Sequence, residues 1–299
     1  MLTLVTIPKP FRGHIGIIQR NAIASWSLLS PRPEIILFGD DEGTAQTANE
    51  FGVRHVSVAR NEYGTPLLDD LFEKAQSLAT NDLICYANAD ILLMNDFMQA
   101  VEQVASQRAG FLMVGQRTDL DMKSPLDFGS GWEQRLLVRV REEGRLHPPA
   151  GSDYFVFPRG LLGRVPRFAV GRPGWDNWMI CHARSRRIIV IDATPVVRAI
   201  HQNHDYSKTG EREAEARRNL ELVGRSIFTI EDATHLLTPK GLKRALDRSH
   251  VWRFLAGLPT FYPHLRLPAR LLFRARRLWH KASARTRVTY IREPHDTQV

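Results

Sequence analysis

The feature that most constrains the fold of this chain is a series of short, uninterrupted apolar runs before residue 115. They occupy residues 2–7, 34–38, 53–58, 82–87 and 110–114. Continuous apolar runs of this length are typical of strands buried on both faces of a parallel sheet, because a strand with one solvated face alternates instead. The sequence therefore predicts a sheet that is covered on both sides.

Helical periodicity separates several of these runs. Thr65 and Pro66 offer a cap and a first-turn proline, after which the apolar residues of 67–78 share one helical face. Asn95 can cap a second helix, whose apolar face covers residues 97–105. Strands alternating with helices of this length predict an α/β fold with a mostly parallel, doubly wound sheet.

Beyond residue 115 the pattern is less regular. Residues 119–131 are polar and turn-rich and are expected to form a long loop. Further strands are expected at 153–157, 188–191 and 196–200, with helices at 178–187 and 211–223. We therefore expect a main domain over residues 1–239 and a separate extension over residues 240–299.

Charge distinguishes these two parts. Residues 1–239 contain 27 Lys and Arg against 29 Asp and Glu, whereas residues 240–299 contain 14 against 3. In the extension, residues 267–280 place leucines on one helical face and arginines around another, which is typical of a helix at an anionic membrane surface. A packed helix with a solvated basic face is the plain alternative, and nucleic acid is a less favoured partner.

Composition excludes several classes of protein. The two cysteines, Cys85 and Cys181, cannot form a disulfide framework, and no apolar run approaches the ~20 residues that span a bilayer. We expect no signal peptide, and the sequence contains no dinucleotide fingerprint, Walker loop or nucleophile elbow. We expect a cytoplasmic protein, with a peripheral position at the inner face of the membrane if the tail binds lipid.

Asn88 and Asp90 form the most informative stretch, because they follow directly after the buried run at 82–87. In open α/β sheets, ligands bind beyond the carboxyl ends of the strands. Hard cations such as Mg²⁺ and Mn²⁺ take oxygen ligands and are often held by carboxylates plus substrate phosphates. The alternative is a turn in which both side chains bond only local backbone.

The order of motifs over residues 2–206 resembles the GT-A glycosyltransferases, which use nucleotide-sugar donors. Asn88-Ala89-Asp90 looks like a variant of their D-x-D motif, with Asp90 the better candidate for the metal. The resemblance implies a nucleotide pocket at the first two strand ends, where Thr6, Pro8 and Asp40 stand here. An ordinary acidic turn at Asp40 is the alternative.

The same resemblance extends to the second half of the domain. Gly151 and Asp153 precede a strand that would approach the donor sugar, although Asp153 could simply face solvent. Asp176 stands between two tryptophans at the place of the family's general base, and Trp175 offers an aromatic face for a sugar. A helix N-cap is the alternative role for Asp176.

A late histidine completes the metal site or contacts the diphosphate in many such enzymes. His201 and His204 both qualify, and His204 is favoured here. The predicted function is metal-assisted transfer of a sugar from a nucleotide-diphosphate donor to a glycan or lipid-linked hydroxyl acceptor, with inversion. The alternatives are a sugar-phosphate nucleotidyltransferase and a non-catalytic scaffold that binds membrane or RNA through its tail.

Overall fold

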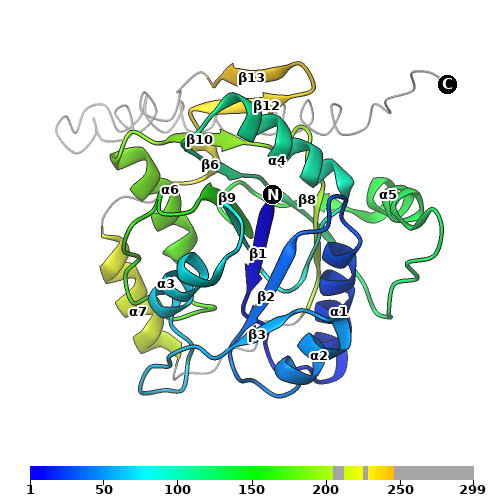
Figure 1. Cartoon of the computed structure of the whole chain (residues 1–299), viewed down its shortest axis with the longest axis horizontal. Coiled ribbons are helices and arrows are strands. Elements are labelled where there is room, and N and C mark those ends of the chain that lie inside the picture. Colours follow the sequence, from blue (N-terminus) through cyan, green and yellow to red (C-terminus); the bar gives the residue numbers. More distant parts are fainter. Residues whose placement is uncertain (205–211, 225–227, 246–299) are drawn as a thin grey trace, which may run out of the picture.

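The computed structural model describes residues 1–204, 212–224 and 228–245 of the 299-residue chain (Figure 1). Among these residues the larger sheet has nine strands, in the order β13-β12-β10-β6-β9-β4-β1-β2-β3. They are β1 (Leu2–Thr6), β2 (Glu34–Phe38), β3 (Arg54–Val56), β4 (Leu83–Ala87), β6 (Phe111–Val114), β9 (Tyr154–Pro158), β10 (Ile189–Asp192), β12 (His235–Thr238) and β13 (Gly241–Arg244).

Most neighbouring strands of this sheet are parallel, which confirms the predicted α/β class. The exceptions are β9, which runs antiparallel to both β4 and β6, and the antiparallel pair β12 and β13. Because β9 is reversed, its first residue lies beside the last residue of β4, and Tyr154 pairs with Ala87. The start of β9 therefore joins the carboxyl ends of β4, β1 and β2 at one edge of the sheet.

Helices cover both faces of the sheet, as the continuous apolar runs predict. The helices are α1 (Gly13–Ser27), α2 (Thr44–Phe51), α3 (Leu68–Leu78), α4 (Asn95–Gln107), α5 (Trp132–Glu143), α6 (Trp175–Ser185) and α7 (Arg212–Val223). Buried residues of α1 and α4 pack on the face that bears Leu2 and Leu4, and those of α3 and α6 pack on the face that bears Val5. Figure 1 shows these helices on opposite sides of the strands.

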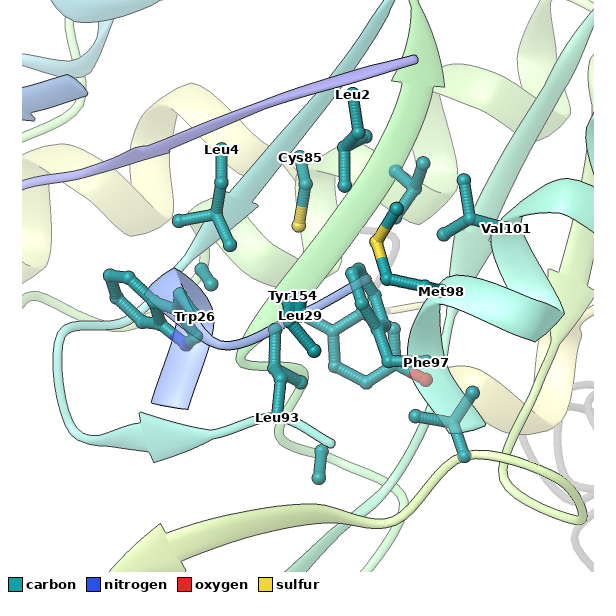
Figure 2. Close-up of a cluster of buried hydrophobic side chains, with 14 of the residues drawn as sticks. Leu2, Leu4, Trp26, Leu29, Cys85, Leu93, Phe97, Met98, Val101 and Tyr154 are labelled. Carbon is teal, nitrogen blue, oxygen red and sulfur yellow. The ribbon is translucent and has the colours of Figure 1, made fainter. Parts of the chain in front are cut away.

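The core on the α1 and α4 side contains several large aromatic side chains (Figure 2). Trp26, Phe97 and Tyr154 are fully buried there, and the rings of Phe97 and Tyr154 meet edge to face with centroids 5.7 Å apart. The indole nitrogen of Trp26 donates to the carbonyl of Ile91 at 2.9 Å. This core thereby anchors the chain segment that immediately follows Asp90.

A second, smaller sheet extends from this edge and has the order β5-β11-β7-β8. Its strands are β5 (Ile91–Leu92), β7 (Arg117–Leu120), β8 (Arg145–Leu146) and β11 (Ala199–Gln202). Strand β11 runs antiparallel to β5 and parallel to β7, with His201 opposite both Ile91 and Asp119. The prediction of a loop over residues 119–131 is therefore wrong for residues 119 and 120, which belong to β7.

Several local expectations also need correction. Helix α4 begins at Asn95 itself, with Met94 as its cap, and α3 begins at Leu68, beyond Thr65 and Pro66. The expected boundary between residues 239 and 240 falls inside the β12–β13 hairpin, so the sheet continues to Arg244. The amphipathic stretch at 267–280 lies outside the described residues. Within the described part of the chain, no helix combines the length and the apolar character needed to cross a bilayer.

Candidate functional site

Asp90 lies in the turn that joins β4 of the large sheet to β5 of the small one. The buried strand β4 ends at Ala87, and the amide of Ile91 closes the turn by donating to the carbonyl of Asn88 at 3.1 Å. Gln202 of β11, which is fully buried, donates its backbone amide and its side-chain amide to the carbonyl of Asp90, both at 3.2 Å. The main chain at Asp90 is thus held by both sheets.

Two histidines converge on the carboxylate of Asp90. His204 Nε2 lies 3.1 Å from Asp90 Oδ2, and His201 Nε2 lies 3.8 Å from the same oxygen. The three candidate ligand atoms lie within 4.8 Å of one another. Both histidine side chains are almost completely buried, so the cluster is rigidly placed. The sequence prediction left the choice between them open, and the structure places both beside Asp90.

The electrostatics of the cluster favour a bound cation. Burial raises the pKa of Asp90, but the hydrogen bond from His204 and the charges of His201 and Lys9 outweigh it, so the pKa falls below its usual value. Burial lowers the pKa of His201 and outweighs the attraction of Asp90. An ionised carboxylate beside a neutral imidazole is the state in which both groups can ligate a metal.

Asp90 Oδ1 provides a direct test of whether the residues fit a metal. This atom is buried, yet no hydrogen bond reaches it from any residue that the structure describes. A buried carboxylate oxygen without a partner is costly unless a ligand satisfies it. Together with the two imidazoles, this oxygen makes a donor set that suits a divalent first-row ion.

Asn88 has a different position from Asp90. Its side-chain amide donates to Asp153 Oδ1 at 2.5 Å, and its backbone amide donates to the Asp153 carbonyl at 2.9 Å. Asn88 therefore ties the end of β4 to the start of β9. The amide at this position binds a neighbouring carboxylate, where an aspartate would repel it.

Asp153 is buried and belongs to the same site. Arg117 Nη1 donates to Asp153 Oδ2 at 2.7 Å. Burial raises the pKa of Asp153 against the opposing effect of Arg117, and the nearby Asp90 raises it further. The alternative of a solvent-facing side chain is wrong, because only 6% of Asp153 is exposed. Gly151, two residues earlier, is half-buried, and a Cβ there would lie 3.4 Å from the imidazole of His147.

Asp176 lies in the first turn of α6 and is half-buried. Burial raises its pKa, and the charge of Asp153 raises it further, so the two carboxylates share one region. The N-cap of α6 is Gly174, with a φ of 105°, so Asp176 is not the cap. Trp175 is 7% exposed and packs edge to face on Tyr86 with centroids 5.0 Å apart, which places it in the core rather than on an open sugar platform.

The first two strand ends hold the remaining predicted residues. Thr6 and Pro8 are buried at the end of β1, and Asp40 is exposed after β2, where it accepts a hydrogen bond from Ser57 at 2.7 Å. Next to Pro8, the backbone of Lys9 is held by the buried side chain of Gln19. Gln19 accepts a hydrogen bond from the Lys9 amide at 2.6 Å and donates one to the Lys9 carbonyl at 2.8 Å.

Sequence reasoning missed Arg117, Asp119 and Lys9. Asp119 contacts Arg117, His147 and His201, and it lies opposite His201 in the β7–β11 ladder. Residues 116–119 are all polar, so they show no apolar alternation that would signal this strand. Lys9 offers no signal beyond its place after the first strand.

Comparisons with known proteins complete the description. No family model matches the chain, and no curated protein sequence matches it. Similar solved structures include glucosyl-3-phosphoglycerate synthase from Mycobacterium tuberculosis in complex with Mn²⁺, uridine-diphosphate and phosphoglyceric acid, at 17% identity and a TM-score of 0.44, covering 76% of this chain and 79% of that one. The complex of that enzyme with Mg²⁺ and uridine-diphosphate matches at 16% identity and a TM-score of 0.44, covering 73% and 76%.

A third match, described as a mycobacterial protein, has 17% identity and a TM-score of 0.45, and covers 73% of this chain and 72% of that one. Identities and TM-scores this low carry no argument about function.

Proposed function

We propose that this chain is a glycosyltransferase that moves a sugar from a nucleotide-diphosphate donor to a hydroxyl acceptor, with Mn²⁺ or Mg²⁺ as cofactor. The observation that carries the proposal is the cluster of Asp90, His201 and His204. It lies at the carboxyl ends of parallel strands, which is where open α/β sheets bind their ligands. The order of motifs that resembles the GT-A glycosyltransferases supports the same function.

Asp90, His201 and His204 are the residues that would hold the cation. When bound there, the cation supplies Lewis-acid stabilisation of the negative charge that develops on the diphosphate leaving group. Asp90 contributes its negative charge and its oxygen Oδ1, which accepts no hydrogen bond from the described residues, and the two histidines contribute ring-nitrogen ligands.

Lys9 provides a second positive charge for the donor. The positive charge of its ammonium group lowers the pKa of Asp90, so Lys9 is close enough to the cluster to act on it. Because Gln19 fixes the Lys9 backbone on both sides of the residue, only the side chain has to be ordered when the donor binds. We assign Lys9 to the donor phosphates, and Thr6, Pro8 and Asp40 to the nucleoside portion of the same pocket.

Asp176 is the residue that we assign to the acceptor. A carboxylate whose pKa is raised by burial and by a neighbouring negative charge is a stronger base than an exposed one. It would remove the proton from the acceptor hydroxyl as the oxygen attacks the anomeric carbon. Direct displacement of this kind inverts the configuration at that carbon. Asp153, which interacts electrostatically with both Asp90 and Asp176, would lie beside the sugar between them.

The assembled cluster favours an enzyme over a non-catalytic scaffold. Burying a carboxylate and two imidazoles costs free energy. A binding or catalytic role explains why such a cluster lies at the carboxyl ends of the strands, whereas a scaffold has no use for it there. A sugar-phosphate nucleotidyltransferase would use the same edge, and the reaction products distinguish it. The lipid-linked acceptor and the peripheral membrane position are parts of this proposal that depend on residues 240–299, whereas the proposed cytoplasmic location rests on the low cysteine content.

The test is hydrolysis and transfer of a panel of nucleotide sugars by the purified chain, with and without Mn²⁺. We expect release of nucleoside diphosphate that depends on the metal, and Asp90→Asn should abolish it. Asp82→Asn is the matched control, because Asp82 precedes the same strand at its opposite end with a side chain that is 96% exposed. Release of pyrophosphate in a parallel assay with a nucleoside triphosphate and a sugar phosphate would instead identify a nucleotidyltransferase. Equal activity of Asp90→Asn and the native chain would refute the site.

A further inference from the structure

Asp119 of β7 accepts hydrogen bonds from Arg117 and His147 and lies beside His201, behind the Asp90 cluster. Its Oδ1 lies 3.0 Å from Arg117 Nε and 3.1 Å from His201 Nδ1, and its Oδ2 lies 2.7 Å from His147 Nδ1. Both oxygens of Asp119 are thus engaged by hydrogen bonds.

The two ring nitrogens of His201 face two different carboxylates. Nδ1 lies 3.1 Å from Asp119 Oδ1, which is a close contact rather than a hydrogen bond. Nε2 lies 3.8 Å from Asp90 Oδ2. This arrangement is produced by strand register, because His201 and Asp119 are directly paired in the parallel β7–β11 ladder. With 3% of its side chain exposed, His201 has no room to turn its ring toward solvent.

We propose that Asp119 is a positioning residue that holds His201 with Nε2 directed at the cation, and this inference rests on the proposed function. A histidine that ligates a metal commonly directs its other nitrogen at a carboxylate, which fixes the ring orientation and the tautomer and strengthens the ligand. Asp119 occupies that place for His201. Asp119 itself does not reach the cation, so its effect passes through the histidine.

Arg117 extends the same network to the sugar side of the site. Its guanidinium donates to Asp119 and Asp153, and Asp153 in turn accepts from Asn88. Arg117 is 11% exposed and its two ion pairs are short, so it holds the two carboxylates at a fixed separation. Through Arg117 and Asp153, Asp119 is therefore connected to the large sheet as well as to its own strand.

The test is a double-mutant cycle on Mn²⁺ affinity, measured by titration calorimetry on the full chain without donor. We expect Asp119→Ala to weaken Mn²⁺ binding by about 10–100-fold, the usual effect of losing an outer-shell partner. In the His201→Ala background, Asp119→Ala should cost nothing further, because the residue through which it acts is gone. Thermal melting checks that each variant folds. If Asp119→Ala does not fold, Asp119→Asn replaces it in the cycle, because asparagine keeps the side-chain volume.

Asp127→Asn is the control, because it removes the same charge from an exposed ion pair with Arg135. Native affinity in the Asp119 variants, or a loss that persists at full size without His201, would overturn the inference. These results can be distinguished from failure of the proposed function itself. If the native chain binds no Mn²⁺, both the proposed function and the role of Asp119 are refuted. If Asp90→Asn loses Mn²⁺ binding but the Asp119 variants do not, only the role of Asp119 is refuted.

Discussion

The metal preference of this chain should follow from its two imidazole ligands. Nitrogen donors bind later first-row ions more tightly than Mg²⁺, which favours all-oxygen sites with several waters. We therefore expect Mn²⁺ to bind more tightly than Mg²⁺, and His204→Ala to reduce the difference between them. Calorimetric titration with each ion measures this. If the ratio of Mn²⁺ affinity to Mg²⁺ affinity is the same in the native chain and in the variant, His204 is excluded as a ligand.

Asp176 should set the lower limit of the pH range for activity. A general base works only when deprotonated, and burial raises the pKa of Asp176 above its usual value. The rate should therefore fall as the pH drops through this raised pKa, beginning at a higher pH than an exposed aspartate would require. Asp176→Asn should keep donor affinity and lose turnover by ~10²–10⁴-fold, the usual contribution of general base catalysis.

Steady-state rates as a function of pH, combined with donor titrations, separate the two roles of Asp176. A variant that loses donor affinity as much as turnover would make Asp176 a binding residue. Near-normal turnover would leave it with no part in the chemistry.

At the scale of elements, the contact between α1 and β5 is a specific stabilising feature. Trp26 packs in the core and donates its indole N–H to the carbonyl of Ile91, one residue after Asp90 (Figure 2). Trp26→Phe keeps an aromatic ring there but leaves a buried carbonyl without this donor, which costs about 1–3 kcal/mol. We expect the free energy of unfolding in urea to fall by that amount.

Trp132→Phe is the control, because Trp132 is only partly buried on α5 and packs at the edge of the separate cluster around Leu136. Its change should be much smaller. An equal loss in both variants would show that side-chain volume matters rather than the hydrogen bond.

At the scale of the whole molecule, the charge asymmetry between residues 1–239 and 240–299 predicts binding to anionic membranes. Each basic residue near such a surface contributes about 1 kcal/mol, and the attraction weakens as salt shortens the Debye length. We expect the full chain to sediment with anionic liposomes at low salt. A chain ending at Ala245 should not sediment, and it keeps the β12–β13 hairpin that an end at Thr238 would cut. Retention of single-stranded RNA at physiological salt, without vesicle binding, would favour the scaffold alternative instead.

The sequence by itself determined the α/β class, the placement of the early strands and the position of Asp90 at the end of one of them. These features depend on local patterns, namely continuous apolar runs and a polar residue directly after a buried strand. The same patterns did not predict α1, α2 or α5. Helix α5 buries only Leu136 and Val140, so its periodic signal is weak.

Only the tertiary structure decided how the candidate site is composed. The reversal of β9 brings Asp153 beside Asn88, and the register of β11 on β5 and β7 brings His201 between Asp90 and Asp119. Arg117 and Asp119 acquire their roles only through these pairings, because nothing in their own neighbourhood distinguishes them from ordinary surface charges. Strand direction and register are set by packing between segments that can lie 110 residues apart, as Ile91 and His201 do. A local sequence pattern carries no information about which distant segment it will meet.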